Sequence, residues 1–308
     1  MCPQLFVHGM NLRNQSRLPP ASVDAFLIRP SGGNSGDSLI FDACERYIRD
    51  RGIDVWRSDG SLEDAARAND TKYLRAALAS FRGMLMFPGG GNIGIYPDND
   101  AIRAAVLKQA GRRHRCLVFS QSAVGPEPAL VDARVTVWCR DSVSYSILRE
   151  AGTRVELVPD MALYMDDMIE KHPDGQGTFY IKRAPGGDTE TIDHGITFDS
   201  PSGDLTWRNS LGDIVTTLKP FDTVISDRLH GGLIALMMRK KVVFLPTGYH
   251  KIRAFYDTWL SPLAGAAFVD TQSDLHPRMA ALQSMTCDPR GLFCKYADPA
   301  LARFLSAG

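Results

Sequence analysis

The segment from Ser226 to Gly232 reads Ser-Asp-Arg-Leu-His-Gly-Gly and carries the side chains best suited to chemistry in this sequence. Arg228 presents a planar, permanently charged guanidinium that can bind a phosphate or a carboxylate. His230 can transfer a proton near neutral pH. An apolar strand precedes the segment and an apolar helix follows it, and the start of a helix adds partial positive charge. The pattern predicts an anion-binding site; the alternative is a surface ion pair of Arg228 with Asp227 beside a packed histidine.

A glycine-rich loop runs from Arg29 to Asp37, between a predicted strand and a predicted helix. Its glycines let the backbone approach a ligand, and the helix that follows offers free N–H groups. Asn34 and Asp37 can accept hydrogen bonds from sugar hydroxyls, or they can cap the helix. The sequence leaves both roles open. The loop is not a Walker A motif, because Gly-Lys-Ser/Thr is missing.

A second glycine-rich loop, from Pro88 to Gly94, follows another apolar strand. Consecutive glycines are costly, on the order of 0.5–1 kcal/mol each relative to alanine in regular structure. Such a run favours a place where a ligand or a neighbouring backbone comes close, so Gly90, Gly91 and Asn92 are predicted to line a substrate cleft. The loop lacks the G-x-G-x-x-G spacing of a dinucleotide site.

Polar side chains also follow two other predicted strands. Gln121 and Ser122 come after Cys-Leu-Val-Phe-Ser, and Arg140 and Asp141 come after Thr-Val-Trp-Cys. Asp141 is predicted to cap the next helix, whereas Arg140 can either face the cleft or pair with a carboxylate. Ligands of doubly wound sheets gather at the carboxyl ends of the strands, so these loops are predicted to share one edge with the other two.

Short apolar runs alternate with helical patterns along the chain, which predicts parallel, doubly wound sheets. A polar, turn-rich stretch at 166–177 interrupts this alternation. It predicts an N-terminal domain at 1–168 and a C-terminal domain at 169–308, whose last helix can pack back on the first. A long surface loop is expected at 184–204. Strands are predicted at Val23–Ile28, Ile53–Trp56, Gly83–Phe87, Arg115–Ser120, Arg134–Trp138, Arg154–Val158, Thr178–Lys182, Thr223–Ser226 and Val242–Leu245, and helices at Ser38–Arg49, Asp100–Ala110, Ser142–Ala151, Leu205–Leu218, from Gly232 and from Asp274.

Charge and hydropathy argue against several classes of protein. The 308 residues include 35 basic and 35 acidic side chains, so no overall field attracts nucleic acid or an acidic membrane. No apolar run approaches the ~20 residues that a membrane-spanning helix needs. The N-terminus lacks the pattern of a secretory signal, which predicts a cytoplasmic protein. The six cysteines form no Cys-x-x-Cys pair, and no metal is expected.

Taken in chain order, the motifs resemble those of the polysaccharide pyruvyl transferases. The Ser-Asp-Arg-Leu-His-Gly segment between a strand and an apolar helix is the most specific of them. The resemblance covers roughly residues 23 to 260, although Gly186–Asp204 matches no part of the family pattern. The other segments that agree are Gly33–Asp37, Gly89–Asn92, Arg140-Asp141 with Leu148 and Gly152, Pro159–Ala162 and His250-Lys251.

The resemblance implies two Rossmann-like domains that face each other across a cleft, as in the GT-B glycosyltransferases. It implies phosphoenolpyruvate as the donor, without a further cofactor. It also implies a lipid-linked or nucleotide-linked saccharide as the acceptor, of which two hydroxyls take up pyruvate as a ketal. The product would belong to an exopolysaccharide, a capsule or a cell-wall polymer. A lipid-linked acceptor would bring peripheral contact with the inner face of the membrane.

The resemblance also suggests a role for each candidate residue. Arg228 and His230 would be catalytic, and Leu229, Arg183 and Lys251 would join them in binding the donor in the C-terminal domain. The loops of the N-terminal domain would bind the acceptor. Two other functions stay open: a GT-B glycosyltransferase that uses a nucleotide-sugar, and a non-catalytic carbohydrate-binding protein. The presence of both a guanidinium and an imidazole favours catalysis, because binding alone does not need a titratable neighbour.

Overall fold

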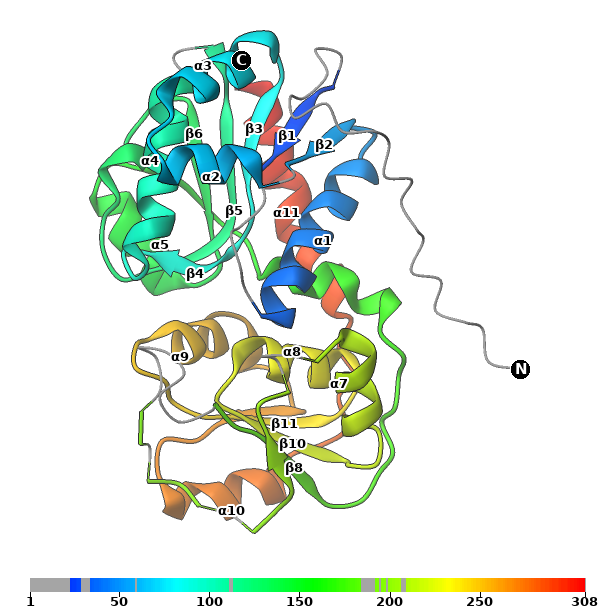
Figure 1. The fold of residues 1–308 in the computed structure, drawn as a ribbon. Coiled ribbons are helices and arrows are strands. Elements are labelled where there is room, and N and C mark those ends of the chain that lie inside the picture. Colours follow the sequence, from blue (N-terminus) through cyan, green and yellow to red (C-terminus); the bar gives the residue numbers. More distant parts are fainter. Residues whose placement is uncertain are drawn as a thin grey trace.

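The computed structural model describes residues 23–28, 34–58, 60–110, 113–183, 192–193, 195–197, 199–205 and 209–307. Within these residues the chain forms two separate β-sheets, each packed with helices, one above the other in Figure 1. Residues 29–33 of the first predicted loop and residues 184–191 of the long loop lie outside the described part.

The first sheet has the strand order β2-β1-β3-β5-β6-β7, with β4 paired to β5. All of its pairs are parallel. Alternate residues of a strand face opposite sides, so Phe26 and Leu85 enter one core while Leu27 and Met86 enter the other. Both faces are therefore buried, which the continuous apolar strands predicted. The strands are β1 Ala25–Leu27, β2 Val55–Arg57, β3 Met84–Phe87, β4 Gly90–Ile93, β5 Cys116–Ala123, β6 Val135–Cys139 and β7 Arg154–Leu157.

Helices cover both faces of this sheet (Figure 1). One face packs against α2 (Ser61–Arg67), α3 (Thr71–Ser80), α4 (Pro97–Ala110) and α5 (Ser142–Glu150). The other packs against α1 (Ser35–Arg49), the 3₁₀ helix η3 (Met161–Met168) and the C-terminal α11 (Pro289–Ser306). The sequence did not predict α2 and α3. α2 has only seven residues, and two of its four buried residues are alanine. A short 3₁₀ turn, η2 (Pro128–Leu130), precedes β6.

The second sheet has the strand order β12-β11-β10-β8-β9, again with parallel pairs. Two predicted helices differ in their starts. α7 begins at Leu211, behind the capping residue Ser210, and α8 begins at Leu229 rather than Gly232. The earlier start places His230 in the first turn of α8. The elements are β8 Thr178–Ile181, β9 Ser202–Gly203, α7 Leu211–Leu218, β10 Thr223–Ser226, α8 Leu229–Met237, β11 Lys241–Phe244, α9 Lys251–Phe255, the π-helical η4 Tyr256–Leu260, β12 Ala266–Phe268 and α10 Gln272–Ala281.

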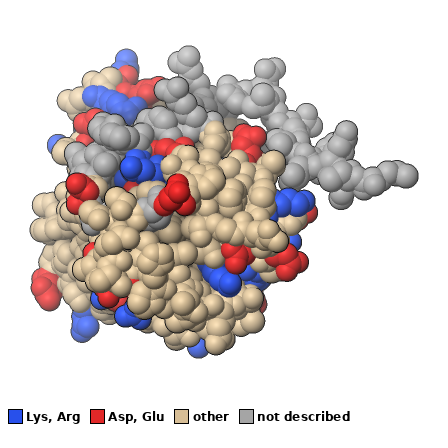
Figure 2. Space-filling model, turned by 90° about the horizontal axis from the view of Figure 1, so that it is seen from below, with Lys and Arg blue, Asp and Glu red and all other residues tan. Residues whose placement is uncertain are grey.

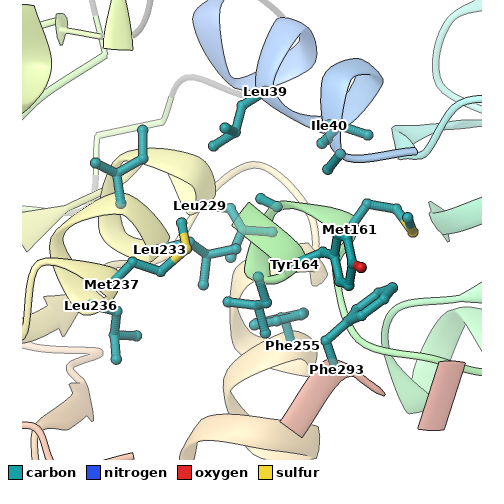
Figure 3. Close-up of a cluster of buried hydrophobic side chains, with 14 of the residues drawn as sticks. Leu39, Ile40, Met161, Tyr164, Leu229, Leu233, Leu236, Met237, Phe255 and Phe293 are labelled. Atoms are coloured by element: carbon teal, nitrogen blue, oxygen red, sulfur yellow. The ribbon is translucent and has the colours of Figure 1, made fainter. Parts of the chain in front are cut away.

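The two halves share one apolar cluster (Figure 3). It joins Leu39 of α1 and Met161 of η3 to Leu229 and Leu233 of α8. The chain crosses between the sheets through η3 and residues 169–177, and α11 returns to the first sheet. The boundary at residue 168 stays a prediction. The C-terminal helix α11 packs with the N-terminal half, as the sequence analysis allowed.

No helix in the described part of the chain combines the length and the apolar content needed to cross a bilayer. Figure 2 views the molecule from the side of the second sheet. Lysines, arginines and acidic residues lie scattered on this face, and no continuous patch of one sign covers it. This face therefore lacks the basic surface that would follow a nucleic-acid backbone.

The packing of α11 gives a first prediction. Phe293 is fully buried, with its ring 5.3 Å from that of Tyr47. Phe293→Ala should lower the free energy of unfolding by about 3–5 kcal/mol. Leu305→Ala on the same helix is the control; Leu305 is 41% exposed, so its loss should change that free energy by no more than about 0.5 kcal/mol. Equal effects in chemical denaturation would contradict the packing of α11 on the first half.

Candidate active site

Arg228 is the N-cap residue of α8, in an extended conformation. Ser226 holds this turn, because its hydroxyl donates to the carbonyl of Arg228 at 2.7 Å and accepts from the N–H of Arg228 at 3.0 Å. The guanidinium is bound by Asp204, with Nε at 3.2 Å and Nη2 at 2.5 Å from the carboxylate oxygens. No side chain of the described residues caps α8, so the positive end of the helix lies beside an oriented cation.

Arg183 and Asp227 form a second buried pair next to this turn. The backbone N–H of Arg183 donates to the carboxylate of Asp227 at 2.9 Å, and its Nε donates to the carbonyl of Asp227 at 3.2 Å. The hydroxyl of Tyr180 also donates to this carboxylate. Burial raises the pKa of Asp227 to about 6, although Arg183 opposes the shift. The alternative of a surface Arg228–Asp227 pair is wrong, because both side chains are buried and the carboxylate bonded to the Arg228 guanidinium is Asp204.

The imidazole of His230 reaches from the second half to the first. Its Nε2 lies 3.5 Å from Oδ2 of Asp160. This nitrogen is fully buried and has no hydrogen-bond partner within the described residues. The opposite edge of the ring lies on Gly36 of α1, where a Cβ would come within 2.3 Å of Nδ1 and 2.6 Å of Cγ. Residue 36 must be glycine for the ring to occupy this position.

Asp160 is a buried carboxylate that both His230 and Arg140 contact. It follows β7, and its Oδ1 accepts from the N–H of Ala162 at 2.9 Å. Its Oδ2 accepts from Nη1 of Arg140 at 2.7 Å, and Nε of Arg140 donates to the hydroxyl of Ser122 at 2.8 Å. Burial alone would raise the pKa of Asp160, but His230 and Arg140 hold the pKa well below its usual range.

The second glycine loop lies over this cluster. Gly90 pairs with Gln121, so the segment forms β4 instead of the expected free loop. Side chains leave no room at Gly91, because a Cβ there would lie 2.5 Å from Nη2 of Arg140 and 2.6 Å from the hydroxyl of Tyr249. Tyr249, from the second half, donates to the carbonyl of Gly91 at 3.0 Å. The close approach that the glycine run predicted is therefore, at Gly91, an approach of protein side chains from both halves.

The first loop shows the capping role. Asn34 accepts from the N–H of Gly36 at 2.8 Å, and Asp37 accepts from the N–H of Asn34 at 2.9 Å, which is a capping box. Ser35 donates from its hydroxyl to the carbonyl of Asn209, so this helix end is also tied to the second half. Whether Asn34 and Asp37 bind an acceptor stays a prediction.

The remaining predicted residues take separate places. Gln121 donates to the carbonyl of Pro88 at 2.8 Å, while its Oε1 is buried without a hydrogen-bond partner in the described residues. Lys251 is largely buried, with Nζ 5.2 Å from the centre of the Tyr249 ring. Leu229 lies in the apolar cluster shared by the two halves (Figure 3).

Sequence reasoning missed three residues of this site. Asp160 stands in a Pro-Asp-Met-Ala segment at the end of a predicted strand, and that position was the available signal. Asp204 lies in the stretch that matched no part of the family pattern, so nothing marked it. Tyr249 precedes the recognised His-Lys pair directly. Within the described residues, no three His, Cys, Asp or Glu side chains are placed to bind one metal ion.

Asn92 belongs to a buried network that supports the second loop. Arg103 donates from Nη1 to Oδ1 of Asn92 at 2.7 Å and from Nε to Glu127 at 2.9 Å. It also donates from Nη2 to Asp100, and Asp100 accepts from the N–H of Gly94 at 3.1 Å. The guanidinium thus anchors the loop to α4.

Comparison with solved structures defines the class of fold. An uncharacterised protein of Klebsiella pneumoniae is similar over 81% of this chain and 94% of its own, with 18% identity and a TM-score of 0.60. A proposed UDP-N-acetylglucosamine 2-epimerase of Listeria monocytogenes is similar over 92% and 96%, with 10% identity and a TM-score of 0.56. The UDP-GlcNAc 2-epimerase of Methanocaldococcus jannaschii is similar over 92% and 99%, with 9% identity and a TM-score of 0.50. At these identities the likeness establishes the fold alone, and the fold is GT-B-like, as expected.

Comparison of the sequence with protein families identifies the family. The family model of the polysaccharide pyruvyl transferases matches residues 34–249, which is most of the chain and includes every element of the cluster around Asp160. The chain therefore belongs to the polysaccharide pyruvyl transferase family, and the family implies a transferase with a saccharide acceptor. No curated protein matches the sequence.

The buried network around Arg103, which supports the second glycine-rich loop, gives a second prediction. Burial raises the pKa of Glu127 to about 7, against the partial opposition of Arg103. The folded protein then holds this proton more tightly than the unfolded chain, so the contribution of Glu127 to stability falls as the pH rises from about 4.5 through 7. In Glu127→Gln the side chain has no ionisable proton. The free energy of unfolding of the variant minus that of the wild type should therefore increase as the pH rises from about 4.5 through 7. A difference that stays constant with pH would contradict the raised pKa.

Proposed function

We propose that this protein transfers pyruvate from phosphoenolpyruvate to two hydroxyls of a saccharide, forming a cyclic ketal. The observation that carries the proposal is the placement of Arg228 and His230 at the start of α8, with the imidazole reaching Asp160 in the other half. An oriented guanidinium suffices to bind an anion. A catalysed reaction, unlike binding alone, also needs a group that moves protons. Membership in the family supports this class of reaction.

In the proposed reaction, C3 of the donor takes up a proton and becomes a methyl group, which opens C2 to attack. One sugar hydroxyl adds to C2 and loses its proton. The bond between C2 and the phosphate oxygen then breaks, and the second hydroxyl adds to C2 and loses its proton. Of the two hydroxyl protons, one balances the new methyl group and the other leaves with inorganic phosphate. The reaction needs no redox partner.

Arg228 is the proposed contact for the phosphate or carboxylate of the donor, together with the positive end of α8. In the structure the Arg228 guanidinium is paired with Asp204, so a bound donor must share the guanidinium with Asp204 or displace Asp204. His230 is the proposed proton-transfer group. Arg183 and Lys251 would add positive charge at the edges of the donor site, and Leu229 would support it from the core.

The acceptor would lie along the carboxyl edge of the first sheet. The buried, unpaired Oε1 of Gln121 offers an acceptor for a sugar hydroxyl there. Asn34, Asp37, Asn92 and the backbone of β4 would complete this side. We further propose a lipid-linked or nucleotide-linked saccharide as the acceptor, used in the cytoplasm for the synthesis of a surface polysaccharide.

A direct assay supplies phosphoenolpyruvate with lipid-linked or nucleotide-linked sugars. The expected products are inorganic phosphate and a sugar that carries a pyruvyl ketal. UDP-GlcNAc without phosphoenolpyruvate forms a second arm. Turnover of the sugar nucleotide, with phosphoenolpyruvate left intact in every mixture, would replace the proposal with an ordinary glycosyltransferase.

Donor binding gives a third prediction. Phosphoenolpyruvate should raise the melting temperature, whereas NAD should not, because the dinucleotide fingerprint is absent. At a hundred times its dissociation constant, a ligand that binds only the folded state adds about 2.7 kcal/mol of stability. Differential scanning fluorimetry measures the shift. The absence of any shift at millimolar phosphoenolpyruvate, with the acceptor present, would count against the donor.

Two variants at the start of α8 give a fourth prediction. Arg228→Lys keeps the charge but loses the two-pronged geometry, so both donor affinity and rate should fall. His230→Ala should lower the rate by about 10²–10⁴-fold and leave donor affinity nearly unchanged. Titration calorimetry and turnover, measured on the folded fraction, separate the two effects. A His230→Ala protein that is less stable but has the wild-type rate would show that the imidazole is only packed.

A further inference from the structure

Oδ2 of Asp160 faces Nε2 of His230 at 3.5 Å, on the side from which a carboxylate can orient an imidazole. We propose that Asp160 is a positioning residue, which holds His230 with the hydrogen on Nε2 and leaves Nδ1 to exchange protons with the substrates. The part of this proposal that concerns substrates rests on the proposed function. The part that concerns the imidazole rests on the geometry of the folded protein alone.

The geometry selects the nitrogen. Nε2 is fully buried and faces Oδ2 of Asp160, so no substrate can reach it. An ionised carboxylate can only accept hydrogen bonds, so the nitrogen that faces it must carry the hydrogen. The other nitrogen, Nδ1, lies beside Gly36 at the N-terminus of α1. In the neutral ring Nδ1 is then the nitrogen that can accept a proton, and in the charged ring both nitrogens carry a hydrogen.

The carboxylate itself is fixed on both oxygens. The N–H of Ala162 holds Oδ1, and Arg140 holds Oδ2. Ser122 in turn fixes the guanidinium of Arg140. Asp160 therefore cannot rotate away from His230, and it remains charged because Arg140 balances it. This order of contacts, from Ser122 through Arg140 and Asp160 to His230, links the first sheet to the first turn of α8.

The charged groups around the imidazole come from both halves. Asp160 and its partner Arg140 face it from the first sheet, and Asp227 and Arg228 belong to its own turn. Asp227 and Arg228 are engaged by Arg183 and Asp204. Among these groups, Asp160 is the carboxylate within 4 Å of the ring nitrogens, and so it is the group that can set the tautomer.

The tautomer is measured directly by ¹⁵N NMR on protein labelled in histidine, without any substrate. The signals of His230 are assigned by their loss in His230→Ala. Wild type should show the hydrogen on Nε2. A neutral wild-type ring with its hydrogen on Nδ1 overturns the proposal.

Kinetics supply the second readout. Asp160→Asn should lower kcat by about 10²–10⁴-fold while donor affinity changes by less than about threefold. A purely structural Asp160 would instead lower the melting temperature and leave kcat per folded molecule intact, which would overturn the proposal.

If Asp160→Asn does not fold, Gly36→Ala displaces the same ring from the other side, since its Cβ would meet Nδ1 at 2.3 Å. It should also lower kcat, whereas Ser38→Ala, at an exposed position on the same helix, should not. Equal rates in Gly36→Ala and Ser38→Ala would contradict the placement of the ring. If wild type shows the expected tautomer but no turnover of phosphoenolpyruvate, the proposed function fails and the role of Asp160 stands.

Discussion

A carboxylate without solvent exposure has to be compensated inside the protein, and the site depends on how Asp160 meets this requirement. Its partners come from three places: the end of β6, the start of η3 and the first turn of α8. The last of these belongs to the other sheet. Removing one partner would leave a buried charge only partly paired, so the contact of His230 with Asp160 also constrains how the halves meet.

The two sheets are assembled around this contact. α1 can approach α8 because residue 36 has no side chain, and the loop before α4 can pass between Arg140 and Tyr249 because residue 91 has none. The shared apolar cluster joins side chains of α1, η3, α8 and α11 (Figure 3). Neither half holds a complete site: the first supplies Asp160, Arg140 and the glycine loops, and the second supplies Arg228 and His230. The proposed ligand, which uses both, would lie between the carboxyl edges of the two sheets, where doubly wound folds bind their substrates.

Much of this could be predicted from the sequence. Continuous apolar runs located the central strands, and a polar motif between an apolar strand and an apolar helix located the turn before α8, although the helix begins at Leu229 and not at Gly232. The partners of the charged groups could not be predicted, because they lie far away along the chain. From the sequence, the available ion-pair partner of Arg228 was its neighbour Asp227. In the structure Asp227 accepts from the backbone of Arg183, and Arg228 pairs with Asp204. Asp160 caps η3, and only the fold shows that it is also buried between Arg140 and His230. β4 was missed because Gly-Gly-Asn-Ile has little strand propensity, and its pairing with β5 is a tertiary effect.

The central claim is that donor chemistry takes place where the first turn of α8 meets Asp160. A crystal structure of the protein with phosphoenolpyruvate tests it most directly. We expect an anionic group of the donor on the guanidinium of Arg228, with Asp204 shifted or sharing it, and the donor within hydrogen-bond reach of Nδ1 of His230. Phosphoenolpyruvate bound away from α8, or Nε2 of His230 turned out of contact with Asp160 and toward the donor, would contradict the claim.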